Sequence, residues 1–125
     1  MGRRDDSGAV TAELAMALPV LLALTAVLAW MLGVGAAQIR VVDASREAAR
    51  VLARGDDPAR ARELALRIAP ARATVAITYH GSDVVVETSA QVRPPGRLLG
   101  SLGGVTVRST ALAAREQVPA GQVAR

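Results

Sequence analysis

Residues 14–37 read LAMALPVLLALTAVLAWMLGVGAA, and no charged side chain occurs between Glu13 and Arg40. As an α-helix, this run would be about 36 Å long, enough to cross the roughly 30 Å hydrocarbon core of a bilayer. Pro19 lies inside the run, where membrane helices tolerate proline because neighbouring groups satisfy the freed carbonyl. The run therefore predicts a single transmembrane helix over residues 9–37.

The composition of the chain excludes several classes of site. The 125 residues include no cysteine, one histidine and two aromatic side chains, and the net charge is +4. Disulfides, cysteine-ligated metals and thiol nucleophiles are therefore excluded, and His80 alone cannot form a multi-histidine metal site. All 15 basic residues are arginines, but two aromatics cannot form a base-stacking platform. We expect no metal, no cofactor and no nucleic-acid partner.

The apolar run has three interpretations that predict different mature proteins. A signal peptide cleaved after Ala37 would release a soluble protein beginning at Gln38, but signal peptides have apolar regions of only about 7–15 residues. A plain membrane anchor would keep its N-terminus. The third interpretation depends on the residues just before the run.

Residues 7–22, SGAVTAELAMALPVLL, resemble the processing site of type IV prepilins and, more specifically, the TadE-like family of the tight-adherence pilus system. In prepilins, a membrane peptidase cuts after a glycine, and a glutamate is the fifth residue of the mature chain. The resemblance implies a leader over 1–8, cleavage between Gly8 and Ala9, and Glu13 as that glutamate. Pro19 and the segment DASREAARVLAR, residues 43–54, also match the family.

The resemblance also implies a cellular role. The chain would be a minor pilin or pseudopilin without enzymatic activity or a small-molecule substrate. It would cross the bacterial cytoplasmic membrane once, with its C-terminal domain outside, in the membrane or in an extracellular pilus. Its partners would be the membrane, prepilin peptidase, other pilin-like subunits and the pilus assembly machinery. The alternative is an unprocessed single-span protein whose exported domain binds a cell-envelope partner.

Physical chemistry gives Glu13 and the small residues of the run specific roles. A carboxylate at the edge of hydrocarbon needs a partner, and cleavage would create one, the α-amino group of Ala9 on a neighbouring chain. Such a pair would set the axial register between subunits. Ala29, Gly33 and Ala37 recur every four residues, a spacing that lets another helix approach closely, and we predict that they pack against another helix together with Pro19.

Arginine counting conflicts with this orientation. Arg3 and Arg4 precede the span, whereas four arginines follow it, at positions 40, 46, 50 and 54. The positive-inside rule therefore places the N-terminus outside, and the resemblance implies the opposite.

The rest of the chain predicts an α+β, pilin-like fold. Residues 38–54 continue the membrane helix with an amphipathic face made by Ile39, Val42, Ser45, Ala49 and Leu52. Asp57 and Pro58 begin a second helix, over 58–69. Alternating patterns predict antiparallel strands over 73–79, 84–92 and 105–114, with Val84, Val86, Ala90 and Val92 facing inward.

These elements predict a leader (1–8), a span (9–37), two helices (38–70), a β domain (71–116) and a flexible tail (117–125). His80, Ser82 and Asp83 are residue types used in catalysis, but they crowd one hairpin turn, where turn geometry favours them. We therefore predict no catalytic residues.

Overall fold

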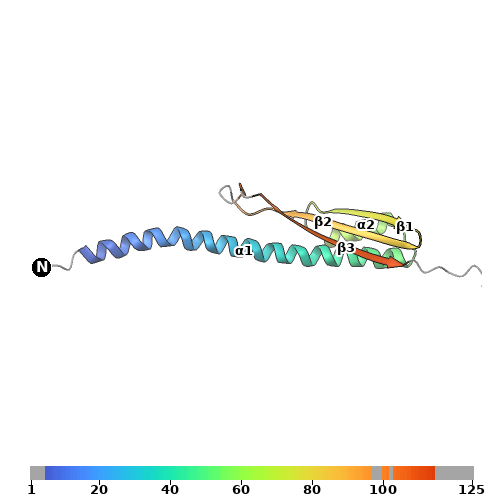
Figure 1. The fold of residues 1–125 in the computed structure, drawn as a ribbon, viewed down its shortest axis with the longest axis horizontal. Coiled ribbons are helices and arrows are strands. Elements are labelled where there is room, and N and C mark those ends of the chain that lie inside the picture. Colours follow the sequence, from blue (N-terminus) through green and yellow to red (C-terminus); the bar gives the residue numbers. More distant parts are fainter. Residues whose placement is uncertain (1–4, 97–99, 102, 115–125) are drawn as a thin grey trace, which may run out of the picture.

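The computed structural model describes residues 5–96, 100–101 and 103–114. It contains helices α1 (Asp5–Ala53) and α2 (Pro58–Ile68) and strands β1 (Thr74–His80), β2 (Asp83–Val92) and β3 (Val105–Ala114). Figure 1 shows α1 as a long rod, with α2 and the sheet packed along its C-terminal half. The expected α+β fold class is confirmed. Residues 1–4 of the predicted leader and the predicted tail, 117–125, lie outside the described residues.

Helix α1 is a continuous helix of 49 residues that contains Pro19. At 1.5 Å per residue it is about 70 Å long. It ends in a Schellman motif: Gly55, with φ of 84°, donates its N–H to the Leu52 carbonyl, and Asp56 donates to the Val51 carbonyl. Glycine suits this position because an L side chain is strained at that φ. The helix therefore stops where the sequence places glycine.

Helix α2 begins where the Asp57–Pro58 pair predicts. Asp57 Oδ1 accepts a hydrogen bond from the Ala59 amide at 3.1 Å, and Pro58 occupies the first turn, where no amide donor is needed. The helix ends at Ile68, one residue earlier than expected. Ala69 is extended because it precedes Pro70, which disfavours helical backbone in the residue before it.

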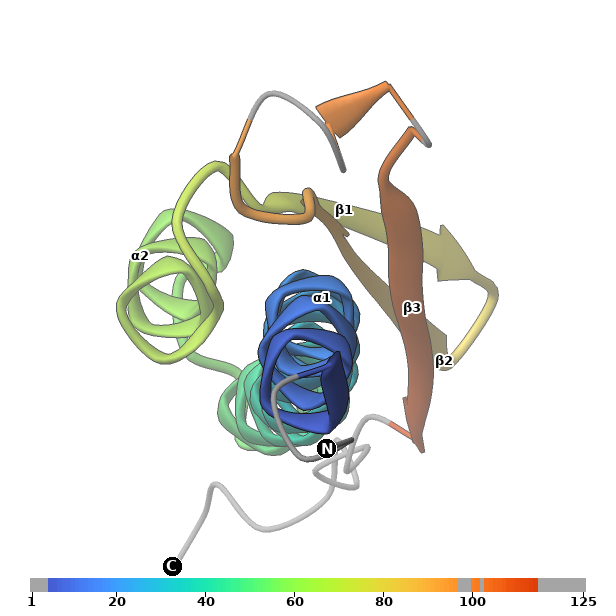
Figure 2. The same ribbon diagram turned by 90° about the vertical axis from the view of Figure 1, so that its left-hand side faces the viewer.

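The three strands form one antiparallel sheet in the order β1-β2-β3. The pairing of His80 with Asp83 closes the first hairpin, and Val92 pairs with Val105 at the other end of the sheet. Val84, Val86 and Ala90 are buried, as the alternation predicts, while Val92 is half-buried. Figure 2, viewed along α1, shows the sheet on one side of the helix and α2 on another. The C-terminal half of α1 is thus the central element of the domain.

The buried face of α1 includes Ser45, Ala49 and Leu52, as predicted, but not Ile39. It consists of Ala37, Val41, Ala44, Ser45, Ala48, Ala49, Val51 and Leu52. Ile39 is 64% exposed, so its assignment to this face is wrong, and Val42 is only half-buried. The sheet approaches α1 along small residues such as Ala44 and Ala48, which a hydrophobicity pattern ranks below isoleucine. Close approach, more than side-chain size, determines which face is covered.

Thr88 supplies a prediction about the stability of this core. Its side chain is 0% exposed, and among the described residues its Oγ1 has no hydrogen-bond partner. Replacing Thr88 with valine keeps the shape and removes an unsatisfied buried hydroxyl, so the free energy of unfolding should rise by about 1 kcal/mol. Urea unfolding of the full chain in detergent measures the change.

Thr78 provides the matched control, because it lies exposed on the outer face of β1. Thr78→Val should alter the unfolding free energy by less than about 0.5 kcal/mol. A Thr88→Val variant less stable than the native chain would show that the hydroxyl is satisfied in solution.

Candidate functional site

The N-terminal half of α1 is an apolar surface that the rest of the chain does not cover. Every side chain over 8–25 is exposed, and large apolar residues such as Leu14, Leu22 and Leu32 are among the exposed residues of this half. Within the described residues, α1 is the one helix long and apolar enough to cross a membrane, and its most apolar window is not buried at all. An exposed apolar surface of this size indicates contact with lipid or with other helices.

Gly8 and Ala9 lie near the start of this surface, inside α1 rather than before it. The helix begins at Asp5, so the bond between Gly8 and Ala9 belongs to its second turn. No other described part of the chain lies within 4 Å of where a Gly8 Cβ would be. The first amides of a helix have no internal acceptors, and glycine weakens a helix by about 1 kcal/mol relative to alanine. This end of α1 can therefore unwind at low cost to present an extended bond.

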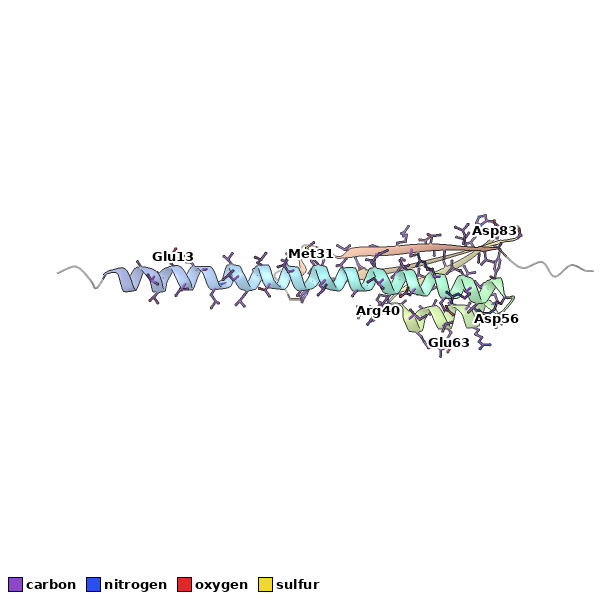
Figure 3. All side chains as sticks on the ribbon, turned by 90° about the horizontal axis from the view of Figure 1, so that it is seen from below. Glu13, Met31, Arg40, Asp56, Glu63 and Asp83 are labelled. Carbon is purple, nitrogen blue, oxygen red and sulfur yellow. The ribbon has the colours of Figure 1, made fainter. Side chains whose placement is uncertain are left out.

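Glu13 lies one helical turn beyond Ala9, and its side chain is exposed. Figure 3 shows it on the part of α1 that extends away from the domain. Within the described residues no ion pair joins it to an arginine of its own chain. The carboxylate is therefore open to a cationic group on another molecule.

The three small residues of the run have different surroundings. Ala29 and Gly33 are exposed, and nothing in the described part of the chain lies within 4 Å of a Cβ placed on Gly33. Ala37 is 8% exposed and packs in a core cluster with Val41, Ala90 and Val107. Its own sheet therefore covers Ala37. Helix packing at Ala29 and Gly33 stays a prediction, as does a packing role for Pro19, which is exposed within α1.

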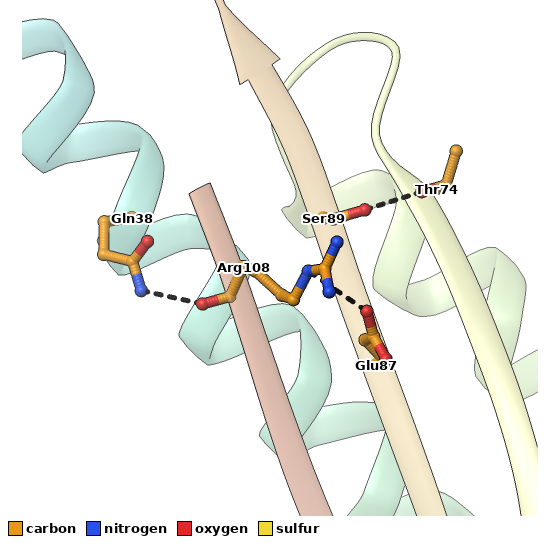
Figure 4. Close-up of polar contacts among 5 residues, drawn as sticks. All are labelled: Gln38, Thr74, Glu87, Ser89 and Arg108. Atoms are coloured by element: carbon orange, nitrogen blue, oxygen red, sulfur yellow. Dashed lines mark hydrogen bonds and ion pairs between the residues drawn. The ribbon is translucent and has the colours of Figure 1, made fainter. Parts of the chain in front are cut away.

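Polar contacts that sequence reasoning did not identify fasten β3 to α1. Gln38 Nε2 donates to the Arg108 carbonyl at 3.1 Å, and Ser45 Oγ donates to Ser109 Oγ at 2.9 Å. Figure 4 shows the Gln38 contact, together with the Arg108–Glu87 ion pair of 3.2 Å on the outer face of the sheet. A serine inside an apolar helical stripe is the one sequence signal for these contacts. They hold the domain in a fixed position along α1.

The hairpin turn of His80, Ser82 and Asp83 lies exposed at the far end of the sheet. Gly81 has φ of 60°, the left-handed conformation that a tight hairpin requires, and Ser82 Oγ donates to Asp83 Oδ1 at 3.4 Å. Throughout the described ranges, no group of three His, Cys, Asp or Glu side chains could hold a metal ion. The turn has a structural explanation that needs no chemistry.

Comparison with known proteins places a family domain on α1. Residues 8–50 match the TadE family, described as TadE-like protein. The chain therefore carries a TadE-like domain that begins at Gly8 and ends within the last turn of α1, and the predicted resemblance is confirmed. No curated protein sequence and no solved structure matches the chain significantly.

Proposed function

We propose that this chain is a minor pilin or pseudopilin that takes part in assembling a tight-adherence type IV pilus, after prepilin peptidase cleaves it between Gly8 and Ala9. The TadE-like domain suggests a protein associated with that pilus system, in a family that is not catalytic. The observation that carries the proposal is the coincidence of three features at the start of α1. The family match begins at Gly8, Glu13 follows at the required spacing, and both lie on an exposed apolar helix.

Cleavage would convert the start of α1 into an assembly site. Removing residues 1–8 leaves a cationic α-amino group on Ala9 at neutral pH. Ala9 and Glu13 are one turn apart on the same face of the helix, so the α-amino group and the carboxylate would face the same neighbouring helix. In a bundle of parallel helices, the α-amino group of one chain can pair with the Glu13 carboxylate of the next. In such surroundings, a neighbouring helix at another axial position would leave the two charges unpaired, at a high cost in free energy. The ion pair therefore sets the register between subunits.

The register of α1 among its neighbours would determine the axial position of the exported domain. Helix α1 runs without a break from the exposed half into the domain core, where Val41, Ala44 and Ala48 are fully buried. An axial position set at Glu13 is therefore transmitted to the part of α1 that contacts the sheet, roughly 40–50 Å away at 1.5 Å per residue. In this proposal the C-terminal domain lies outside the cytoplasmic membrane, with the N-terminus on the peptidase side.

The alternative is an unprocessed single-span protein whose exported domain binds a cell-envelope partner. The continuity of α1 through Gly8 favours it, since an intact helix from Asp5 is a good membrane anchor as it stands. The two functions differ in whether residues 1–8 remain on the chain.

Replacing Gly8 with alanine distinguishes the pilin function from the unprocessed anchor. In cells that contain prepilin peptidase, Gly8→Ala should reduce the cleaved fraction at least about tenfold, because alanine stabilises the helix at the scissile bond by about 1 kcal/mol and adds a side chain where the peptidase must approach. The ratio of long to short chain on a denaturing gel measures cleavage.

Gly35 offers a matched control, because it is also an exposed helical glycine, and no described residue comes within 4 Å of where its Cβ would lie. Gly35→Ala should be cleaved like the native chain. If the native protein showed the same fraction of uncleaved chain with and without the peptidase, the pilin proposal would be rejected in favour of the unprocessed anchor.

A further inference from the structure

The end of the exported domain nearest the membrane, here called the proximal end, lies where the apolar run of α1 stops. It consists of α1 residues 34–41, the α2–β1 connection (69–73) and the described part of the β2–β3 connection. Its core is a small cluster in which Val34, Ala37 and Val41 of α1 pack with apolar residues of the sheet ends, namely Ala73, Ala90, Val92 and Val107. These contacts hold the α2–β1 connection and the ends of β2 and β3 at one level along α1.

The domain reaches back beside the last turns of the apolar run. Val34 packs against the domain core, and Trp30, one turn earlier, is half-buried with a fully covered Nε1. Figure 1 shows the described part of the connection between β2 and β3 lying alongside α1, on the N-terminal side of the strand ends. If α1 spans a bilayer, this connection lies at the depth of the lipid headgroups, where tryptophan is also enriched.

The proximal end carries positive charge without compensating carboxylates. Arg40, Arg72 and Arg93 are exposed and come from α1, the α2–β1 connection and the end of β2. In the described part of the chain, none of them forms an ion pair. Arg93 donates to the neutral Gln91 side chain, and the nearest acidic residue on α1 is Asp43, one turn further from the span.

Four other arginines of the domain lie within 4.0 Å of a carboxylate, in the pairs Arg50–Glu47, Arg54–Asp56, Arg67–Glu63 and Arg108–Glu87. Arg46, Arg60 and Arg62 form no ion pair in the described part of the chain, so the proximal end is distinguished by its lack of acidic residues. The segments 68–75 and 88–114 contain no acidic residue. The domain is therefore electrically asymmetric, and its basic end is the one next to the span.

We propose that the proximal end is a docking surface for the anionic phospholipid headgroups of the leaflet from which α1 emerges. The proposal rests on the membrane span of the proposed function, but neither on cleavage nor on pilus membership. Arginines near an anionic leaflet are attracted to it within about one Debye length, roughly 10 Å at 0.1 M salt. Because α1 enters the same bilayer, it keeps the proximal end, with its three arginines, next to that leaflet. Docking would set the height and tilt of the domain on the membrane.

The composition of the chain allows a direct test, because it has no cysteine and a single tryptophan. A fluorophore on Gly100→Cys would report from the β2–β3 connection, where none of the described residues comes within 4 Å of an added Cβ. Ser82→Cys, in the turn at the opposite end of the sheet, is the matched control. The full chain is reconstituted in phosphatidylcholine vesicles with or without phosphatidylglycerol, with a nitroxide quencher attached to some headgroups.

With phosphatidylglycerol present, the Gly100 label should be quenched at least about twofold more than the Ser82 label. Neutralising the proximal end with R40Q, R72Q and R93Q together, or raising salt to about 1 M, where the Debye length is about 3 Å, should remove most of this difference. Equal quenching of the two labels, or quenching of Gly100 that is independent of phosphatidylglycerol, would overturn the proposal. Loss of Gly100 quenching at high protein-to-lipid ratio would assign the surface to a second copy and would overturn it too.

The fluorescence of Trp30 distinguishes failure of headgroup docking from failure of the proposed function. Lipids brominated on their acyl chains should quench Trp30 if α1 spans the bilayer. Quenched Trp30 with an unquenched Gly100 label would reject headgroup docking alone. Unquenched Trp30 would reject the membrane span and, with it, both proposals.

Discussion

Replacing Glu13 with alanine is expected to leave cleavage after Gly8 largely intact and to reduce incorporation of the chain into pili, or into complexes with partner subunits, by at least about tenfold. A tenfold loss corresponds to about 1.4 kcal/mol, less than the about 3–5 kcal/mol for breaking a fully buried ion pair, because the edge of the span is partly hydrated. Glu13 has no ion-pair partner within the described part of its own chain, so the loss should appear in assembly and not in folding. Co-purification of partner subunits from membranes, normalised to the amount of chain, measures it.

Two further substitutions show whether charge is responsible. Glu13→Gln keeps the shape and hydrogen-bonding oxygen but removes the charge, so it should resemble Glu13→Ala. Leu14→Ala, at the next exposed position, removes apolar area without touching charge and should have a much smaller effect. Native levels of incorporation for Glu13→Ala would contradict the register mechanism.

Replacing Ala48 with leucine is expected to destabilise the domain by about 1–3 kcal/mol, a large part of the roughly 5–15 kcal/mol that holds small domains together. Ala48 is 0% exposed and belongs to the cluster that joins α1 to Val84 and Val86 of the sheet. The larger leucine side chain would force the sheet away from the helix. Hydrogen exchange of the β2 amides should accelerate correspondingly.

Ala76→Leu is the matched control, because Ala76 is exposed on the outer face of β1. Its exchange rates should stay close to native values. If Ala48→Leu exchanged as slowly as the native chain, the small residues of α1 would not be what brings the sheet close.

The element boundaries were predictable because local chemistry determines them. Asp57 and Pro58 begin α2 through a side-chain cap and a residue that needs no amide partner, and Gly55 ends α1 through its positive φ. Alternation along 84–92 predicts the strand because one face is buried against α1. Each of these signals acts between residues that are close in the chain, so each can be recognised from the sequence.

The features that sequence reasoning missed depend on three-dimensional proximity. Ile39 is larger than Val41 and Ala44, yet the covered face of α1 passes through the latter two. The sheet packs there because the small side chains let it approach α1 closely. Ala37 fits a small-residue row for a neighbouring helix, but its own sheet occupies that position. The bond from Gln38 to Arg108 joins residues 70 positions apart and leaves no local pattern.

The residues of the candidate site were easier to predict because they differ from the apolar sequence beside them. Glu13 is a carboxylate at the edge of an apolar run and Gly8 is a glycine just before it, so both can be identified from the sequence alone. What the structure adds is their setting: both lie exposed on a helix that continues without a break into the domain core. Proximity again explains why the basic proximal end was missed, since its three arginines are far apart in sequence.

The mass of the N-terminal peptide, measured on the chain extracted from membranes of cells that contain prepilin peptidase, tests the pilin assignment most directly. We predict a mature chain that begins at Ala9, with residues 1–8 absent. A chain that retains Met1 to Gly8 in those cells would contradict the assignment.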